Sequence, residues 1–244
     1  MDIKDLALAM REFGEAQYPN EACGLVVKVG KKSLPVVCRN RAEDPRNNFV
    51  MDIHDYAAAA DQGEIIGVWH THVECPNSPS DADLVGCENS GLPWYITSIH
   101  KSEDGFISDG PIVVNPSGFE LPYLERPYVF GVLDCWSLVR DYYRREFGIT
   151  LGDYPRIEKF WEQGHDFFGQ NWKNEGMVKL IDREPIPGDL FILQTGHANP
   201  NHIAIYIGDD MILHHCHGRL SRRDIYAGYW HKHTMLHLRH ESKC

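Results

Sequence analysis

The sequence lacks long apolar runs and is poor in positive charge. No uninterrupted apolar stretch approaches the ~20 residues that span a bilayer, so no membrane segment is expected. The first residues, Met1–Asp5, are typical of the start of an amphipathic helix, and no secretion signal is visible in them. The 24 Lys and Arg residues are outnumbered by 35 Asp and Glu residues, which gives a formal net charge of −11. Because an acidic surface repels backbone phosphates, we expect no nucleic acid binding.

The chain also lacks the dense cysteine framework of small secreted domains. Its seven cysteines are an odd number and widely scattered, which predicts reduced thiols and synthesis in the cytoplasm. No internal repeat or low-complexity tract is present. With 43% hydrophobic and 24% charged residues over 244 positions, the composition is typical of a folded soluble protein with room for two domains.

Hydrophobic periodicity divides the chain into two parts with different element order. The first part alternates predicted helices (residues 3–13, 54–61 and from about 80) with predicted strands (residues 22–29, 64–69, 94–99 and 112–114), which indicates an α/β domain over residues 1–118. Turn-forming residues place the domain boundary between about 115 and 126. The second part has a helix from Asp134, an irregular segment over residues 152–176 and short strands from Asp189, an α+β pattern over residues 126–244.

A metal-ligand pattern lies at the end of the apolar strand 65–69. His70 and His72 are two residues apart in a strand, so their side chains project to the same face from Cα atoms ~7 Å apart. A catalytic zinc site has three protein ligands and an open position, and Asp83, in the first turn of the next helix, is the best third ligand. Asp81 and Cys75 are competing ligands of lower rank.

Two further side chains complete the chemistry that amide hydrolysis by a metal requires. Zinc makes water a nucleophile at neutral pH, but a carboxylate must still carry a proton to the leaving amine, and Glu21 is the candidate. Ser80 offers a hydroxyl to a developing oxyanion, or it is only the N-cap of the helix that follows.

A thiol pattern follows in the second part. Asp134 is a natural N-cap, so Cys135 lies in the first helical turn, where the helix dipole favours the thiolate. The segment 202–214 is a hairpin about a turn at residues 208–210, and its pairing sets His214 nearly opposite Ala204 and diagonal to His202. One histidine would activate the thiol in an ion pair, with a pH optimum bounded by both groups, and the other would orient the first.

Two alternatives remain open for the thiol pattern. A free cysteine is more often a buried structural residue than a nucleophile. The cluster at residues 214–217, with three histidines and Cys216, could hold a metal, although one strand does not direct adjacent residues to one point.

The metal-ligand segment HTHVECPNSPSDADL, together with the upstream PNEACG, resembles the signature of the JAMM (Mov34/MPN) metalloproteases. The resemblance implies a JAMM-like domain over residues 1–118 in which Zn²⁺ is the cofactor. It implies further that His70, His72 and Asp83 are the zinc ligands, that Glu21 is the general acid/base and that Ser80 stabilises the oxyanion. Val73 departs from the family, which usually has proline after the second histidine.

The segments DCWSLV, PGDLF and HIAIYIGDDMILHH resemble the NlpC/P60 cysteine peptidases. The resemblance implies a papain-like α+β domain over residues 126–244, with Cys135, His202 and His214 as the catalytic residues. His215 is a less favoured third residue. The departure is Trp136-Ser137, where the family commonly has Ser-Gly.

A JAMM-like domain followed by an NlpC/P60-like domain resembles the tail tip proteins of lambda-like siphophages. The resemblance implies a virion component made in the host cytoplasm that acts in the host cell envelope. Its partners would be other tail tip proteins, and its thiol domain would cut peptidoglycan stem peptides as DNA enters; the substrate of the metal domain stays open. The alternatives are a structural tail protein with vestigial sites and a bacterial cell-wall or ubiquitin-like-processing hydrolase.

Overall fold

The computed structural model describes residues 3–154 and 156–244. It divides into two compact units, the first ending at Glu120 and the second beginning at Leu121. Among these described residues, none of the helices has the length and apolar character needed to cross a bilayer.

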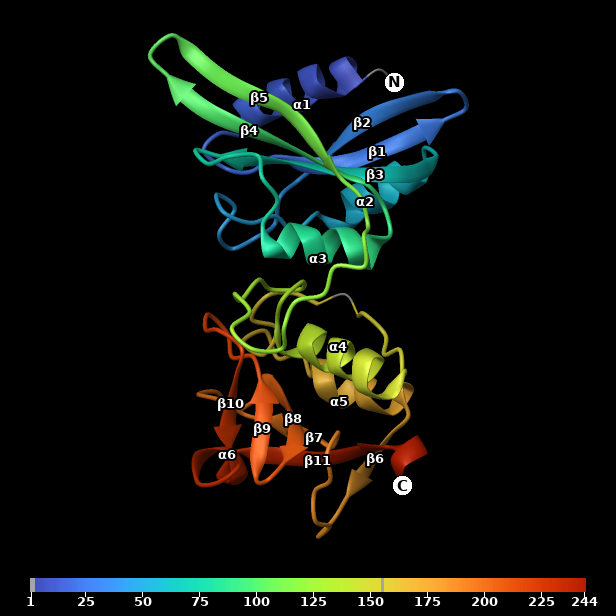
Figure 1. Ribbon diagram of the computed structural model, residues 1–244, viewed down its shortest axis with the longest axis vertical. Coiled ribbons are helices and arrows are strands. Elements are labelled where there is room, and N and C mark those ends of the chain that lie inside the picture. Colours follow the sequence, from blue (N-terminus) through green and yellow to red (C-terminus); the bar gives the residue numbers. More distant parts are fainter. Residues whose placement is uncertain (1–2, 155) are drawn as a thin grey trace. The chain divides into compact units, whose positions relative to one another are not determined.

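The first unit is a five-stranded sheet with helices on both faces (Figure 1). Its strand order is β2-β1-β3-β4-β5, and only β3 and β4 run parallel. The strands are β1 (Cys23–Val29), β2 (Lys32–Cys38), β3 (Glu64–Val73), β4 (Trp94–Ser102) and β5 (Gly105–Val114). The helices are α1 (Ile3–Gln17), α2 (Ile53–Ala60) and α3 (Asp81–Ser90).

Alternation along β1 explains why the sheet is covered on both faces. Val26 points to the face that packs against Leu6 and Met10 of α1, whereas Leu25 and Val27 point to the face shared with α2 and α3. Because successive strand side chains alternate, a continuous apolar run has two faces to bury. This two-sided packing confirms the α/β class predicted for the first part.

The second unit is a six-stranded sheet of order β10-β9-β8-β7-β11-β6. Its strands are β6 (Met177–Leu180), β7 (Leu190–Leu193), β8 (His202–Gly208), β9 (Met211–His214), β10 (Arg222–Ile225) and β11 (Thr234–His240). Its helices are α4 (Cys135–Phe147), the short α5 (Phe167–Asn171) and α6 (Tyr229–Lys232), with 3₁₀ turns η1 (Trp172–Glu175) and η2 (Glu241–Lys243). The helix that precedes the strands confirms the predicted α+β class.

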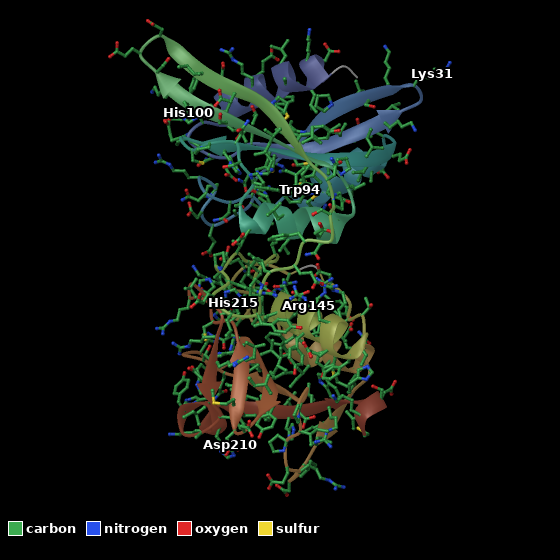
Figure 2. All side chains as sticks on the ribbon, viewed as in Figure 1. Lys31, Trp94, His100, Arg145, Asp210 and His215 are labelled. Atoms are coloured by element: carbon green, nitrogen blue, oxygen red, sulfur yellow. The ribbon has the colours of Figure 1, made fainter. Side chains whose placement is uncertain are left out.

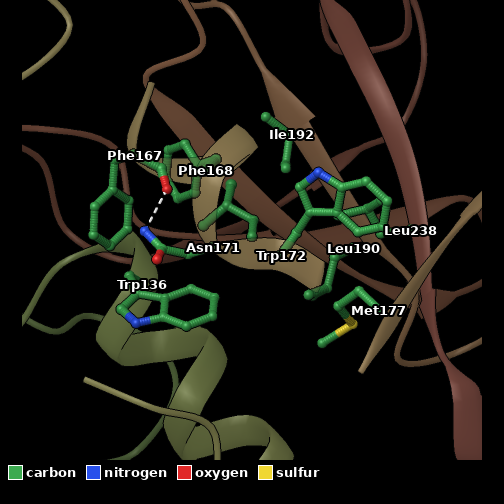
Figure 3. A pocket seen from close by; sticks show the side chains of 10 residues that line it. Trp136, Phe167, Phe168, Asn171, Trp172, Met177, Leu190, Ile192 and Leu238 are labelled. Carbon is green, nitrogen blue, oxygen red and sulfur yellow. Dashed lines mark hydrogen bonds between the residues drawn. The ribbon is translucent and has the colours of Figure 1, made fainter. Parts of the chain in front are cut away.

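An aromatic layer holds α4 against this sheet. Figure 3 shows Trp136 of α4 beside Phe167 and Phe168 of α5, and Leu190, Ile192 and Leu238 of the strands line the same pocket. The side-chain amide of Asn171 donates a hydrogen bond of 2.7 Å to the backbone carbonyl of Phe167 within this layer. Full burial of one such large side chain contributes roughly 1.5–3 kcal/mol, so this core fixes the position of the first turn of α4.

Candidate functional site

The three candidate metal ligands of the first unit converge at one point. His70 and His72 lie near the end of β3, and their Nε2 atoms are 3.1 Å apart. Asp83, in the first turn of α3, places Oδ1 3.1 Å from Nε2 of His70 and Oδ2 3.2 Å from Nε2 of His72. All three side chains are buried. The strand geometry predicted from the sequence therefore brings the two imidazoles together with the carboxylate.

Hydrogen bonds outside the cluster orient its members. Ser80 is the N-cap of α3 in a reciprocal capping box with Asp83, and its hydroxyl donates a bond of 2.8 Å to Oδ2 of that carboxylate. Nδ1 of His72 lies 2.8 Å from the carbonyl oxygen of Pro76. A carbonyl only accepts, so Nδ1 carries a proton, and Nε2 is the nitrogen that faces the cluster.

The donor set fits a zinc ion. Zinc–nitrogen and zinc–oxygen bonds of ~2.0–2.2 Å in a tetrahedron set neighbouring ligand atoms ~3.3 Å apart, close to the observed separations. Burial lowers the pKa of His70, which favours the neutral imidazole that a metal requires. Although burial alone would raise the pKa of Asp83, its electrostatic interaction with His70 and its hydrogen bonds to both histidines lower it strongly, so the carboxylate stays ionised. Cys75 and Asp81, the competing candidates, are both exposed and lie outside the cluster.

Glu21 lies beside this cluster because of strand register. Cys23 pairs with His70, and the next pair is joined by the backbone bond from Thr71 to the carbonyl of Ala22, so continuing the register sets Glu21 level with His72. The side chain is buried, which raises its pKa to about 8, and the electrostatic interaction with His72 opposes that rise. A buried carboxyl at this place can hold and pass on a proton.

In the second unit, Cys135 is the first residue of α4, and Asp134 before it is the N-cap of that helix. Asp134 and Ser137 form a reciprocal capping box. Oδ2 of Asp134 also accepts a bond of 2.6 Å from Nη2 of Arg156, and both side chains are buried. Burial alone would raise the pKa of Asp134, but the charge of Arg156 and the bonded amide of Ser137 outweigh it and lower the pKa.

Breaking this buried pair is expected to destabilise the second unit. Removing one partner of a buried ion pair leaves the other uncompensated, so Asp134→Asn and Arg156→Met should each lower the free energy of unfolding by ~3–5 kcal/mol in urea titrations. The double variant should lose less than the sum of the two. Arg144→Met, which removes an exposed partner of Asp141, is the control and should cost ~0–1 kcal/mol.

The same pair predicts a pH dependence. Because the pKa of Asp134 is lowered by folding, its contribution is present above the ordinary carboxyl pKa and is lost as pH falls through the lowered value. Unfolding free energies of the wild type and Asp134→Asn should therefore converge in acid. A constant difference between them down to the acid transition would contradict this assignment.

The two histidines form a hydrogen-bonded relay. Ala204 pairs with His214 across β8 and β9, which confirms the register predicted from the hairpin. Nε2 of His202 lies 3.0 Å from Nδ1 of His214, and Nε2 of His214 lies 3.1 Å from Oδ2 of Asp224 on β10. With its Nε2 occupied by His214, His202 has Nδ1 left to receive a proton.

Cys135 and His202 line one pocket at the start of α4. Cys135 is partly exposed, and the backbone amide of Ile203, the residue after His202, interacts with its thiol and lowers the thiol pKa. The two side chains therefore border the same cavity. The rest of the pocket wall is largely aromatic.

The expectation of a resting thiolate is wrong. Burial and, to a smaller extent, the neighbouring charge of Asp134 raise the pKa of Cys135 to about 12, against the lowering by Arg156 and the Ile203 amide. Burial also lowers the pKa of His202 well below 6.5. The resting pair is therefore a neutral thiol and a neutral imidazole, because desolvation in this pocket outweighs the helix dipole.

His215, the less favoured third residue, directly follows β9. It lies at the opposite end of that strand from Asp210, in the turn that precedes β9 (Figure 2). It is buried, lines the Cys135 pocket and packs edge-on against Tyr128. The bond to His202 comes from His214 instead.

Two residues near the thiol site were missed by sequence reasoning, and a third was given a low rank. Arg156 comes from the irregular segment and Asp224 from β10, so no local pattern links them to Cys135 or His214. Cys216 belongs to the cluster at residues 214–217, which the sequence left open as a metal site of low rank because adjacent strand residues do not point to one place. The structure brings its sulfur 3.5 Å from Nδ1 of His214, because the two are separated by two positions rather than adjacent.

Known families match both units. Residues 4–107 match the model of prokaryotic homologs of the JAB domain, and residues 125–239 match the NlpC/P60 family. Tail tip assembly protein K of Escherichia phage N15 is 36% identical over 234 residues, 96% of this chain and 93% of that protein. The protein of the same name from Escherichia phage lambda is 31% identical over 196 residues, 79% of this chain and 90% of that protein. The desampylase of Pyrococcus furiosus is 31% identical over 84 residues, 32% of this chain and 59% of that enzyme.

Fold, site and family matches together define a protein with a JAB-like domain followed by an NlpC/P60 peptidase domain. More narrowly, the chain belongs to the tail tip assembly protein K family of lambda-like phages.

Proposed function

We propose that the second unit is a peptidoglycan endopeptidase that cuts stem peptides while the phage genome enters the cell. The observation that carries this proposal is the shared pocket of Cys135 and His202, with His202 held by His214. A nucleophile, a base and an orienting group in this order are the requirement for covalent amide hydrolysis. The chain would act in the host envelope, carried in the tail tip beside other tail tip proteins after synthesis in the host cytoplasm.

The geometry supports a general-base mechanism. As the sulfur of Cys135 attacks the stem-peptide carbonyl, Nδ1 of His202 takes the thiol proton and later gives it to the leaving amine. His214 holds the ring of His202 and is itself held by Asp224. Water then attacks the thioester, returns its proton through His202 and releases the acid with Cys135 as a thiol again.

For the first unit we propose a zinc-dependent isopeptidase or protease. His70, His72 and Asp83 would hold Zn²⁺, which supplies Lewis acidity and activates water. Glu21 would pass a proton to the leaving amine from its place level with His72. Ser80 donates to Asp83, which orients that ligand, and we keep for its hydroxyl the oxyanion role that the family resemblance implies. We propose residues 1–118 and 126–244 as the two catalytic domains.

Digestion of purified sacculi tests whether the chain is an enzyme or a scaffold. The wild type and His70→Ala should release soluble muropeptides, whereas Cys135→Ala should release none above buffer. Equal inactivity of all three proteins would favour a structural tail component with vestigial sites.

The ionisation of the resting pair predicts the pH profile of the thiol site. The pKa of His202 is lowered well below 6.5, so its imidazole stays unprotonated in mildly acid solution. The kcat/KM for a soluble stem peptide should therefore stay constant around pH 6.5 and fall only at lower pH. Alkylation of Cys135 by iodoacetamide, followed by mass spectrometry, should keep accelerating above neutral pH, since its thiol pKa is about 12. An acid limb centred at 6.5 or higher, or a neutral plateau of alkylation, would indicate the ion pair instead.

A further inference from the structure

A second group of metal-ligand atoms lies in the second unit, on the far side of the His202 ring from Nδ1. Nε2 of His202 is 3.0 Å from Nδ1 of His214 and 3.9 Å from Sγ of Cys216, and that sulfur is 3.5 Å from Nδ1 of His214. A tetrahedral zinc ion with bonds of ~2.0–2.3 Å sets nitrogen pairs ~3.3 Å and nitrogen–sulfur pairs ~3.6 Å apart. The three atoms therefore already stand near three corners of such a tetrahedron.

The fold presents this group in the way that metal sites are built. His214 and Cys216 are two residues apart on the run that leaves β9, and the pairing of β8 with β9 brings His202 beside them. His202 and His214 are buried while Cys216 is partly accessible, which leaves an approach for an ion. The second ring nitrogen of His214 is bonded to the carboxylate of Asp224, an outer contact typical of metal-ligating histidines.

We propose that His202, His214 and Cys216 bind a thiol-preferring divalent cation of the zinc class, and that this binding and thiol catalysis exclude one another. The regulatory half of this inference rests on the proposed peptidase function. It concerns a site distinct from the ligand cluster of His70, His72 and Asp83.

Cation binding and thiol catalysis exclude one another because both depend on where His202 carries its ring proton. In the working base, Nε2–H of His202 donates to His214, and Nδ1 is unprotonated. A cation that binds Nε2 displaces the proton from it and takes the lone pair so freed, so the single ring proton moves to Nδ1 through solvent, and Nδ1 no longer accepts the proton of Cys135. Cys216 binds as the thiolate and His214 keeps Nε2–H toward Asp224, so each bound cation releases one proton, from the thiol of Cys216.

Cobalt spectroscopy on the full chain tests the site without any need for peptidase activity. All proteins carry His70→Ala, so that the first unit does not contribute a histidine site, and are freed of metal by a chelator. Titration with Co²⁺ should give a near-ultraviolet thiolate-to-cobalt band that excess Zn²⁺ removes. The band should persist in Cys135→Ser and Cys75→Ser and disappear in Cys216→Ser.

The switch is tested by the ratio of cleavage rates with and without Zn²⁺ within each protein. Stoichiometric Zn²⁺ should inhibit release of muropeptides by the Cys216-containing protein at least tenfold. Cys216→Ser should need at least tenfold more Zn²⁺ for the same inhibition, because loss of a ligand weakens the site by no less than loss of an outer contact, ~10–100-fold.

The proposal is overturned if the thiolate band is absent, if it survives in Cys216→Ser, or if Zn²⁺ inhibits both proteins at the same concentration. A chain that forms the band but does not cut sacculi when freed of metal defeats the proposed peptidase function and the switch, whereas the metal site stands.

Discussion

Asp83→Ala is expected to abolish zinc binding by the first unit. One carboxylate oxygen of Asp83 lies 3.1 Å from Nε2 of His70, and the other lies 3.2 Å from Nε2 of His72. Asp83 is one of the three ligand side chains in the cluster. Since loss of an outer contact alone weakens metal sites ~10–100-fold, loss of this ligand should weaken zinc binding at least ~100-fold. Zinc retained after dialysis, measured in a Cys216→Ser background that leaves only this site, should fall from about one per chain to background.

Asp81→Ala is the matched control for this prediction. Asp81 occupies the first turn of the same helix but is exposed and lies outside the cluster, so its variant should keep the zinc. Equal retention by Asp83→Ala and Asp81→Ala would remove the metal assignment. Glu21→Gln should also keep the zinc, but any amide hydrolysis by the first unit should drop ~10²–10⁴-fold, the usual contribution of a general acid/base.

His202→Ala should reduce kcat of the thiol site by ~10³-fold or more, the second large effect. His202 is the only group of the relay that lines the pocket together with Cys135, so its loss removes the base itself. His214→Ala should cost less, about 10²-fold, since His214 acts by orienting the ring of His202. Asp224→Asn should cost least, because it acts one step further away.

The losses of kcat in these three variants are measured on a soluble stem peptide in the presence of a chelator. His231→Ala replaces an exposed histidine outside the relay and should keep wild-type kcat. His214→Gln, which retains a polar contact to His202, should recover part of the loss of His214→Ala. If His215→Ala lowers kcat more than His214→Ala, the third residue has been assigned wrongly.

Local periodicity was enough to predict the features set by strand geometry. Alternation in β3 put His70 and His72 on one face, and the turn after β8 fixed the pairing of Ala204 with His214. Both α/β and α+β classes follow from the order of such local elements. The strand β2 was missed because Lys32, Ser33 and Pro35 interrupt its apolar pattern.

Features set by tertiary contact were not predictable from the sequence. A helix N-terminus favours a thiolate, but whether the pocket around Cys135 excludes water depends on rings that come from distant segments. The partner of Asp134 is Arg156, 22 residues later in an irregular stretch. The convergence of Cys216 with the histidine relay likewise requires the path of the chain after β9.

Mass spectrometry of the ends created in purified sacculi tests the central claim most directly. The wild type should expose new amino groups within the stem peptides, and Cys135→Ala should expose none above buffer. The same new ends at the same rate from Cys135→Ala would contradict a thiol peptidase built on Cys135 and His202.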